Sequence, residues 1–161
     1  MRRYIMLHVG IFGSSGVGKT TWLSSMLGQP RSDTLGINIQ SYRFDGRNVL
    51  FYDTSGRIEY DTLLESTLDD VDVAIFAYDV SSRRTFADAL LWMNRFLGRK
   101  KKACALLGMP GANRIISSVD VSIATRPWVR QGARIWFDEV DKDSFGSILR
   151  FFVKTHTNHE K

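Results

Sequence analysis

The sequence predicts an α/β protein with a mostly parallel central sheet of about six strands, one antiparallel edge and helices on both faces. Three observations support this class. Strand-like and helix-like segments alternate along the 161 residues. Residues 71–79 form a nearly continuous apolar run, which is typical of a strand covered on both faces. Residues 145–153 carry apolar side chains at helical spacing. Because this length is ordinary for one domain, we expect residues 1–161 to form a single domain.

The first half of the chain predicts a strand, a helix and a hairpin. Residues 4–12 indicate a buried strand, and the helix over 19–27 should stop at the glycine that follows it. Residues 37–44 and 48–53 indicate two strands, joined by a turn at Asp45-Gly46. This hairpin is the source of the antiparallel edge.

The second half continues the alternation, so the whole order is β-α-β-β-α-β-α-β-α-β-α. After the strand at 71–79 we expect a helix at 86–97, a strand at 103–107, a weak helix at 117–126 broken at Pro127, a strand at 133–137 and a final helix. In such sheets ligands bind at the carboxyl ends of the strands.

Composition excludes several classes of protein. Hydrophobic residues make up 43% and charged residues 24%, which is ordinary for a globular protein and excludes disorder. The single cysteine, Cys104, cannot form an internal disulfide, so a reducing compartment and a cytoplasmic location are expected. No apolar run is long enough to cross a membrane. The net charge of +5 alone does not indicate nucleic-acid binding, and we expect none.

A phosphate-binding loop follows the first predicted strand. It reads Gly13, Ser14, Ser15, Gly16, Val17, Gly18, Lys19, Thr20 and matches the pattern G-x-x-x-x-G-K-[ST]. The glycines let backbone N–H groups face phosphates, and the start of the next helix adds partial positive charge. Lys19 is long enough to reach the outer phosphates, and the Thr20 hydroxyl suits Mg²⁺. We expect nucleotide contacts to extend to Thr21.

Three further stretches carry a family resemblance. They are Thr34-Leu35-Gly36-Ile37, then Asp53-Thr54-Ser55-Gly56, and Tyr78-Asp79-Val80-Ser81 followed by Thr85-Phe86 and Trp92. With the phosphate loop, they make the chain resemble a Ras-superfamily small GTPase, closest to the Rab branch. The resemblance is strong from Tyr4 to about Leu97 and implies the P-loop small-GTPase fold.

The resemblance also implies roles for individual residues. Thr34 would bind Mg²⁺ and sense the terminal phosphate, and Asp53 would act on Mg²⁺ through water. The metal shell would therefore comprise Thr20, Thr34 and Asp53. Gly56 would offer its N–H to the terminal phosphate. Lys19 and Thr34 would be the groups that assist hydrolysis.

Two departures from the family pattern stand out. Arg57 occupies the place of the family's glutamine, and a guanidinium cannot accept a hydrogen bond from the attacking water. Arg57 could still stabilise phosphate charge, but an exposed arginine at the start of a helix is the simpler interpretation. Met109-Pro110-Gly111-Ala112 stands where the family has Asn-Lys-x-Asp, so Ala112 offers guanine no carboxylate. An alternative alignment brings Asn113 to the base.

Other contacts are expected from the same resemblance. Effectors would read a surface containing Ile39, Tyr52 and Thr67, although ordinary sheet packing explains these residues too. Main-chain N–H groups near residues 139–141 would meet the guanine carbonyl. The final residues hold no cysteine, so no prenyl anchor is expected, and membrane contact would need a partner or the basic run at 99–102.

These observations leave three classes of function. The first is a GTP-binding switch or interaction module that holds GTP or GDP with Mg²⁺ and hydrolyses GTP slowly. The second is a pseudo-GTPase, a structural subunit whose nucleotide is static or absent. The third is a small ATP-dependent enzyme, which the switch-like segments and the lack of an arginine-rich lid disfavour.

Overall fold

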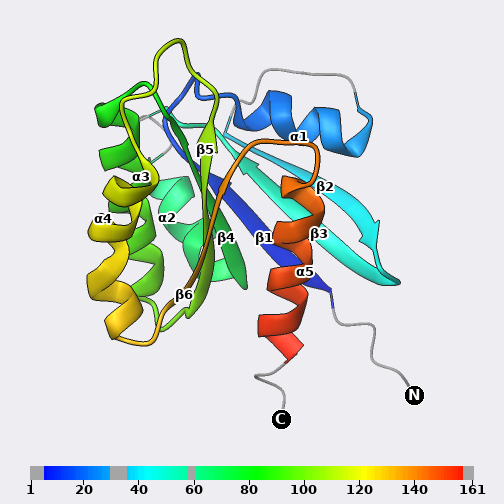
Figure 1. The fold of residues 1–161 in the computed structure, drawn as a ribbon. Coiled ribbons are helices and arrows are strands. Elements are labelled where there is room, and N and C mark those ends of the chain that lie inside the picture. Colours follow the sequence, from blue (N-terminus) through cyan, green and yellow to red (C-terminus); the bar gives the residue numbers. More distant parts are fainter. Residues whose placement is uncertain (1–5, 30–35, 58–60, 158–161) are drawn as a thin grey trace.

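The computed structural model describes residues 6–29, 36–57 and 61–157, and these residues form a six-stranded sheet with the order β2-β3-β1-β4-β5-β6 (Figure 1). The strands are β1 (Leu7–Phe12), β2 (Ile37–Phe44), β3 (Arg47–Thr54), β4 (Val73–Asp79), β5 (Ala103–Met109) and β6 (Arg134–Glu139). β2 pairs with β3 in antiparallel fashion, and every other neighbouring pair is parallel. The predicted fold class and element order are confirmed.

Helices cover both faces of the sheet (Figure 1). They are α1 (Lys19–Leu27), α2 (Asp61–Asp70), α3 (Arg83–Leu97), α4 (Ser118–Arg130) and α5 (Ser144–Thr157). Buried side chains of α1 and α5 pack on one face, and those of α2, α3 and α4 pack on the other. Because β1, β4 and β5 lie between two layers, nearly all of their residues are buried.

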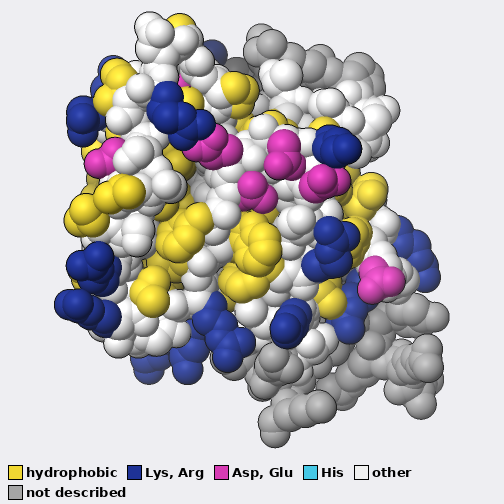
Figure 2. Space-filling model, in the orientation of Figure 1, with side chains coloured by type: hydrophobic (Ala, Val, Ile, Leu, Met, Phe, Trp, Pro, Cys, Tyr) yellow, Lys and Arg dark blue, Asp and Glu magenta, His cyan; other side chains and the backbone are white. Residues whose placement is uncertain are grey.

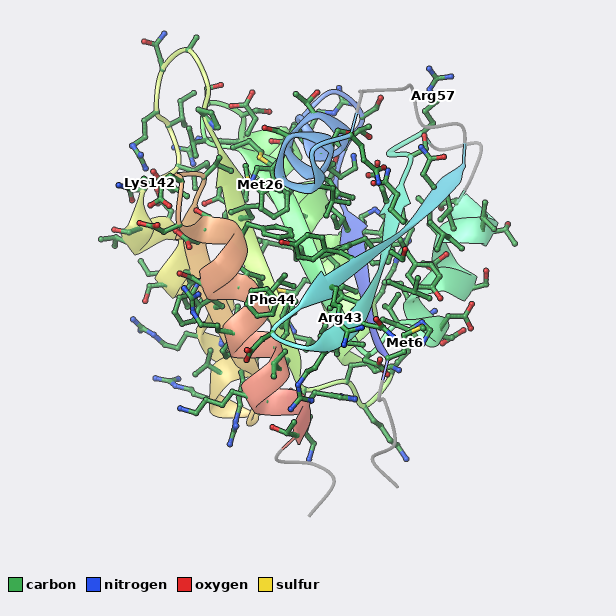
Figure 3. All side chains as sticks on the ribbon, turned by 90° about the vertical axis from the view of Figure 1, so that its right-hand side faces the viewer. Met6, Met26, Arg43, Phe44, Arg57 and Lys142 are labelled. Carbon is green, nitrogen blue, oxygen red and sulfur yellow. The ribbon has the colours of Figure 1, made fainter. Side chains whose placement is uncertain are left out.

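The hairpin between β2 and β3 turns where the sequence predicts. Asp45 and Gly46 both adopt positive φ, at 50° and 75°. This pair of conformations suits a two-residue hairpin turn, and glycine adopts it at little cost. At the tip of the hairpin Phe44 packs against the core on the α5 side, which Figure 3 shows.

The prediction that the helix before Pro127 would break there is wrong. α4 begins after a capping box between Ser117 and Asp120 and runs through Pro127 to Arg130. Pro127 cannot donate a hydrogen bond to the carbonyl of Ile123, one turn earlier. Both residues are exposed on the same side of the helix, so water can satisfy that carbonyl and the helix continues.

Several boundaries move by a few residues. β4 starts at Val73 rather than at Val71, whose N–H still belongs to the end of α2 and donates to Thr67. β5 and β6 each extend two residues further than predicted, to Met109 and Glu139, because Met109 pairs with Asp79 of β4 and Glu139 pairs with Gly108 of β5. No helix in the described ranges is long and apolar enough to span a bilayer.

Candidate nucleotide-binding site

The carboxyl ends of the five parallel strands meet at one end of the sheet. β1 lies between β3 and β4, so the loop after β1 is central at this end. The segment after β3 flanks it on one side, and the ends of β4, β5 and β6 lie on the other. This is where open parallel sheets bind ligands, and all the predicted site segments that the structure describes gather here.

The phosphate loop is seated tightly against the sheet at Gly13. Its φ is 152°, and a Cβ built there would lie 2.4 Å from the carbonyl oxygen of Ala77 in β4. No side chain fits at this position, so glycine lets the chain leave β1 close to its neighbour. The loop then ends at Gly18, and α1 begins at Lys19 with no side-chain cap. Gly18 therefore brings no side chain to the amino-terminal end of α1, an end that favours an anion.

Lys19 folds back over the loop that precedes it. Its Nζ donates to the carbonyl oxygens of Gly13 at 2.7 Å and Ser14 at 2.9 Å. The side chain is almost fully buried, and this desolvation lowers the pKa of Lys19 to about 8, although the negative charge of Asp53 acts in the opposite direction. The structure therefore holds a cation inside the curve of the loop, where a phosphate group would relieve its desolvation.

Two of the three predicted metal ligands touch each other. The Thr20 hydroxyl donates to Oδ2 of Asp53 at 2.8 Å. Hydroxyl and carboxylate oxygens are donors that Mg²⁺ prefers, so this pair fits the ion by its chemistry. Thr34, the third predicted ligand, lies outside the described residues. Gly36, two positions later, accepts a hydrogen bond of 2.7 Å from the N–H of Ser55 and so lies beside the segment that follows Asp53.

Gly56 joins the second predicted switch to the phosphate loop. A Cβ at Gly56 would lie 2.1 Å from the backbone nitrogen of Ser15, so only glycine allows this approach. The next residue, Arg57, is exposed, and its side chain points outward from this end of the sheet in Figure 3. Its backbone N–H donates to Ser55 Oγ at 3.3 Å. The two segments predicted to contact the terminal phosphate are thus in direct contact.

The end of β5 differs from the phosphate side. Gly111 turns tightly against the end of β4, because a Cβ there would lie 2.2 Å from Oδ1 of Asp79. A cavity of about 180 Å³ lies beside this turn. Its lining residues are Val80, Gly108, Pro110, Gly111, Arg114, Glu139 and Val140. Ala112 is the residue after Gly111 in the sequence and is exposed. Its methyl group accepts no hydrogen bond.

Two of the main-chain N–H groups near residues 139–141, which were expected to bind the guanine carbonyl, already donate hydrogen bonds within the protein. The N–H of Val140 donates to the carbonyl of Gly108 at 3.0 Å. The N–H of Asp141 donates to Ser144 Oγ at 2.9 Å, in the cap of α5. The expectation that these groups meet the guanine carbonyl is therefore wrong for Val140 and Asp141, because sheet pairing and the helix cap use both.

A side-chain ion pair at this cavity was not predicted. Arg114 binds Glu139 through both guanidinium NH groups, and this ion pair lowers the pKa of the Glu139 carboxyl. Burial and, to a lesser extent, the negative charge of Glu139 raise the pKa of the neighbouring Tyr78 to about 12. Charge and spacing alone could not reveal this contact, because the two residues come from a loop and from the end of β6.

A second unpredicted contact anchors the phosphate loop. Ser14 Oγ donates to Oδ2 of Asp88 in α3 at 2.7 Å. Asp88 is half-buried and precedes Ala89 on the buried side of α3. The helical pattern could have marked Asp88 as a carboxylate bordering the core, but its partner lies 74 residues earlier in the chain.

The predicted effector surface is only partly exposed. Ile39 in β2 is 59% exposed and pairs in register with Tyr52 in β3. Tyr52 is half-buried, and its hydroxyl lies 2.8 Å from Nδ1 of His8. Including Thr67 in this surface was wrong, because Thr67 is 3% exposed and its hydroxyl donates to the carbonyl of Leu63 within α2. The surface therefore reduces to Ile39 and Tyr52.

The fold and the loop geometry define an α/β nucleotide-binding domain with a phosphate loop after its first strand. The model of the Ras family matches residues 8–111, so the chain belongs to the Ras family, whose domains bind guanine nucleotides. The match ends at Gly111, one residue before Ala112. The match to the family therefore ends within residues 109–112, the segment that departs from the family's guanine-binding motif.

Individual relatives agree with this assignment. The chain is 30% identical to Ras-related protein RABG3e of Arabidopsis thaliana over 104 residues, covering 60% of this chain and 50% of that protein. It is 29% identical to Ras-related protein Rab-19 of Mus musculus over 97 residues, covering 55% and 45%. It is 28% identical to the intraflagellar transport protein 27 homolog of Trypanosoma brucei over 114 residues, covering 64% and 62%. The chain spans about half the length of the first two relatives, and it is a divergent Rab-like member of the family.

Proposed function

We propose that this chain is a single-domain GTP-binding module that holds GTP or GDP with Mg²⁺ and hydrolyses GTP slowly. The observation that carries the proposal is the buried Lys19, which lies over the carbonyls of Gly13 and Ser14 beside the paired Thr20 and Asp53. A buried cation at the amino-terminal end of a helix costs folding free energy that a bound phosphate would recover.

The proposed ligand contacts follow from this arrangement. Backbone N–H groups of the loop from Gly13 to Thr21 would surround the outer phosphates, with Gly56 adding its own N–H. Thr20 and Asp53 would hold Mg²⁺, which neutralises phosphate charge when bound. Thr34 is proposed as the third oxygen donor on the family pattern.

Bound nucleotide tests this proposal directly. The protein is purified without added nucleotide and then denatured, and the supernatant is separated on an anion-exchange column. Retained GTP or GDP at about one molecule per chain supports the GTP-binding module.

The altered guanine-binding segment favours a second candidate function, a pseudo-GTPase that serves as a structural subunit. That candidate predicts a chain purified without nucleotide that also fails to bind added GTP.

Hydrolysis without a partner should be slow. Because Arg57 cannot accept a hydrogen bond from water, we expect a rate at or below about 10⁻⁴ s⁻¹. The change Arg57→Gln supplies an amide that both donates and accepts, and should raise the rate on the order of tenfold or more. Single-turnover release of phosphate from preloaded GTP measures both rates.

Arg57→Lys is the matched control for this experiment. It keeps the positive charge and still lacks an acceptor, so its rate should equal that of the natural protein. A natural protein that turns over roughly tens of times per minute without a partner would show that another group orients the water.

Partner binding should depend on Ile39 and Tyr52. We propose that an effector docks on this surface, because exposed apolar side chains beside a nucleotide-sensing segment are typical docking sites. Ile39→Asp and Tyr52→Ala should each reduce capture of partners from cell extract by protein loaded with a non-hydrolysable GTP analogue. Nucleotide affinity should stay nearly unchanged, since neither side chain reaches the phosphate loop.

The control is an exposed apolar residue on another surface, and Ile123→Asp on α4 serves, because Ile123 is 58% exposed. If Ile123→Asp removes the same partners while Ile39→Asp leaves them bound, the docking surface lies on α4 instead. Each captured set is identified by mass spectrometry and compared with the set from GDP-loaded protein.

A further inference from the structure

β6 ends the sheet and directs half of its backbone groups away from it. The N–H of Arg134 donates to Lys102 at 2.6 Å, and the N–H of Val140 donates to Gly108 at 3.0 Å. Even-numbered residues of β6 therefore face β5. Successive residues of a strand point their N–H and C=O groups to opposite sides, so Ile135, Phe137 and Glu139 direct theirs outward. No described strand pairs with this outer edge.

The outer edge of β6 is protected against pairing only towards its ends, where Arg134, Asp138 and Glu139 are charged. Native edge strands carry charged residues, proline or bulges that discourage a new strand. The middle of β6 is instead Ile135-Trp136-Phe137, and Phe137 is 44% exposed. At the other edge of the sheet, the middle of β2 is the polar pair Gln40-Ser41. Figure 2 faces β6 and shows hydrophobic side chains below an acidic cluster and above basic side chains along the lower rim.

The residue order of β6 is complementary to itself. We propose that β6 pairs in antiparallel fashion with β6 of a second copy of this chain, about a two-fold axis at Trp136. In this register Arg134 lies opposite Asp138 of the second copy, and Ile135 lies opposite its Phe137. The outward-facing N–H and C=O groups of Ile135 and Phe137 then meet each other, as an antiparallel ladder requires. Opposite charges and apolar side chains both stabilise such cross-strand pairs.

Other registers are less favourable. Outward-facing residues must lie opposite one another, so a shift moves the two-fold axis by one residue along the strand. Centring on Phe137 places Ile135 opposite Glu139 and Trp136 opposite Asp138, so both apolar residues meet carboxylates. Centring on Ile135 places Arg134 opposite Trp136 and Asp138 opposite Gly132, so neither charge meets an opposite one. Centring on Trp136 is the register that matches charge with opposite charge and apolar with apolar along the strand.

Apolar side chains border β6 on both faces of the sheet. On the α5 face, the rings of Trp136 and Phe151 lie tilted against each other with their centroids 5.4 Å apart. On the α4 face, a cavity of about 370 Å³ lies between α4 and β6 and is lined in part by Ser118, Ser122 and Phe137. In the proposed register Ile135 of the second copy lies across from Phe137, at the border of this cavity. The association would thus bury apolar surface as well as pair the strands, which a short strand needs for stability.

A charge exchange tests the register. We expect the natural protein to sediment at twice the mass of one chain. Arg134→Asp and Asp138→Arg should each raise the dimer dissociation constant at least about tenfold, because each places like charges opposite each other. The double variant Arg134→Asp/Asp138→Arg restores opposite charges and should restore the dimer. Arg130→Asp, an exposed arginine on α4, is the matched control and should leave the dimer unchanged.

Cysteine cross-linking tests the axis independently. Directly opposed residues of a non-hydrogen-bonded pair have Cα atoms about 4.5 Å apart, which is within reach of a disulfide. Trp136→Cys should therefore form a covalent dimer under mild oxidation, and Phe137→Cys should form much less. The natural Cys104 is buried, and burial raises the pKa of its thiol to about 12, so it adds no background. Circular dichroism of every variant confirms folding.

Three results would overturn the proposal. One is a natural protein that stays monomeric at about 100 µM, a concentration at which weak specific dimers still form. Another is a dimer that tolerates both charge reversals, or that the exchanged pair fails to restore. The third is more efficient cross-linking through residue 137 than through residue 136, which would place the axis elsewhere.

Discussion

Replacing Lys19 with alanine should weaken GTP binding by about 2 kcal/mol or more, which is at least about 30-fold in Kd. Lys19 is 5% exposed and already lies in the curve of the phosphate loop, held by the carbonyls of Gly13 and Ser14. A phosphate would therefore meet a positioned and desolvated cation, and charge-assisted hydrogen bonds of this kind are the strong ones. Isothermal titration calorimetry with GTP and Mg²⁺ measures the change.

Lys102→Ala is the matched control. It removes the same charge from an exposed position at the amino-terminal end of β5, the opposite end of the sheet. If long-range attraction between a positive protein and a negative ligand were responsible, both variants would lose affinity alike. Equal Kd values for the natural protein and Lys19→Ala would show that the outer phosphates lie away from this side chain.

The same experiment should depend on pH in a defined direction. Burial lowers the pKa of Lys19 to about 8 in the free protein. A nearby phosphate favours the charged form and raises that pKa, so binding takes up a proton above about pH 8. Affinity should be full below the free-protein pKa and should fall by up to about tenfold per pH unit as the pH rises through it. Lys19→Ala should lack this part of the pH dependence.

Elements bounded by local signals were predicted well. α1 occupies the predicted residues because Gly18 and Gly28 adopt left-handed conformations at its two ends. The phosphate loop was recognised because its residues are contiguous and each type has a local reason. The ends of β5 and β6 were not predicted, since they depend on pairing between strands that are distant in sequence. α4 passes Pro127 because this side of the helix is exposed, which the sequence does not state, and water can replace the one lost hydrogen bond.

Within the candidate site, too, the residues that belong to a motif were predicted and the others were not. Lys19, Thr20 and Asp53 were found by motif, and the Thr20 hydroxyl bonds to Asp53 although 33 residues separate them. Family resemblance supplied that pairing. No motif covers the contact of Ser14 with Asp88 or the ion pair of Arg114 with Glu139, so only the tertiary structure reveals them.

Restoring a carboxylate at the base end should sharpen the choice between GTP and ATP. In the family pattern an aspartate accepts two hydrogen bonds from guanine, and Ala112 accepts none. Losing charge-assisted bonds of this kind costs roughly 2–3 kcal/mol. We therefore expect the natural protein to discriminate between GTP and ATP about 100-fold less well than a typical small GTPase does. Phosphate and Mg²⁺ contacts, which the two nucleotides share, would supply most of the affinity.

Ala112→Asp should raise GTP affinity by about 2 kcal/mol and leave ATP affinity unchanged. Ala112 is exposed beside the cavity at Gly111, so the new side chain has room and its charge stays solvated in the free protein. Ala112→Asn is the matched control, because an amide of the same size brings no negative charge and should recover much less. Paired Kd values for GTP and ATP on all three proteins give the selectivity.

Few groups of the protein are left to bind guanine, because the N–H groups of Val140 and Asp141 already donate hydrogen bonds within the protein. The remaining polar pair at the cavity is Arg114 with Glu139, and each charge there satisfies the other. A natural ratio of Kd values for ATP and GTP above about 10⁵ would show that guanine is read in full. Asn113, or Glu139 released from Arg114, would then be the reader. In that case Ala112→Asp would bring no gain. Glu139→Gln would lower GTP affinity alone if Glu139 is the reader, and Asn113→Ala would do so if Asn113 is.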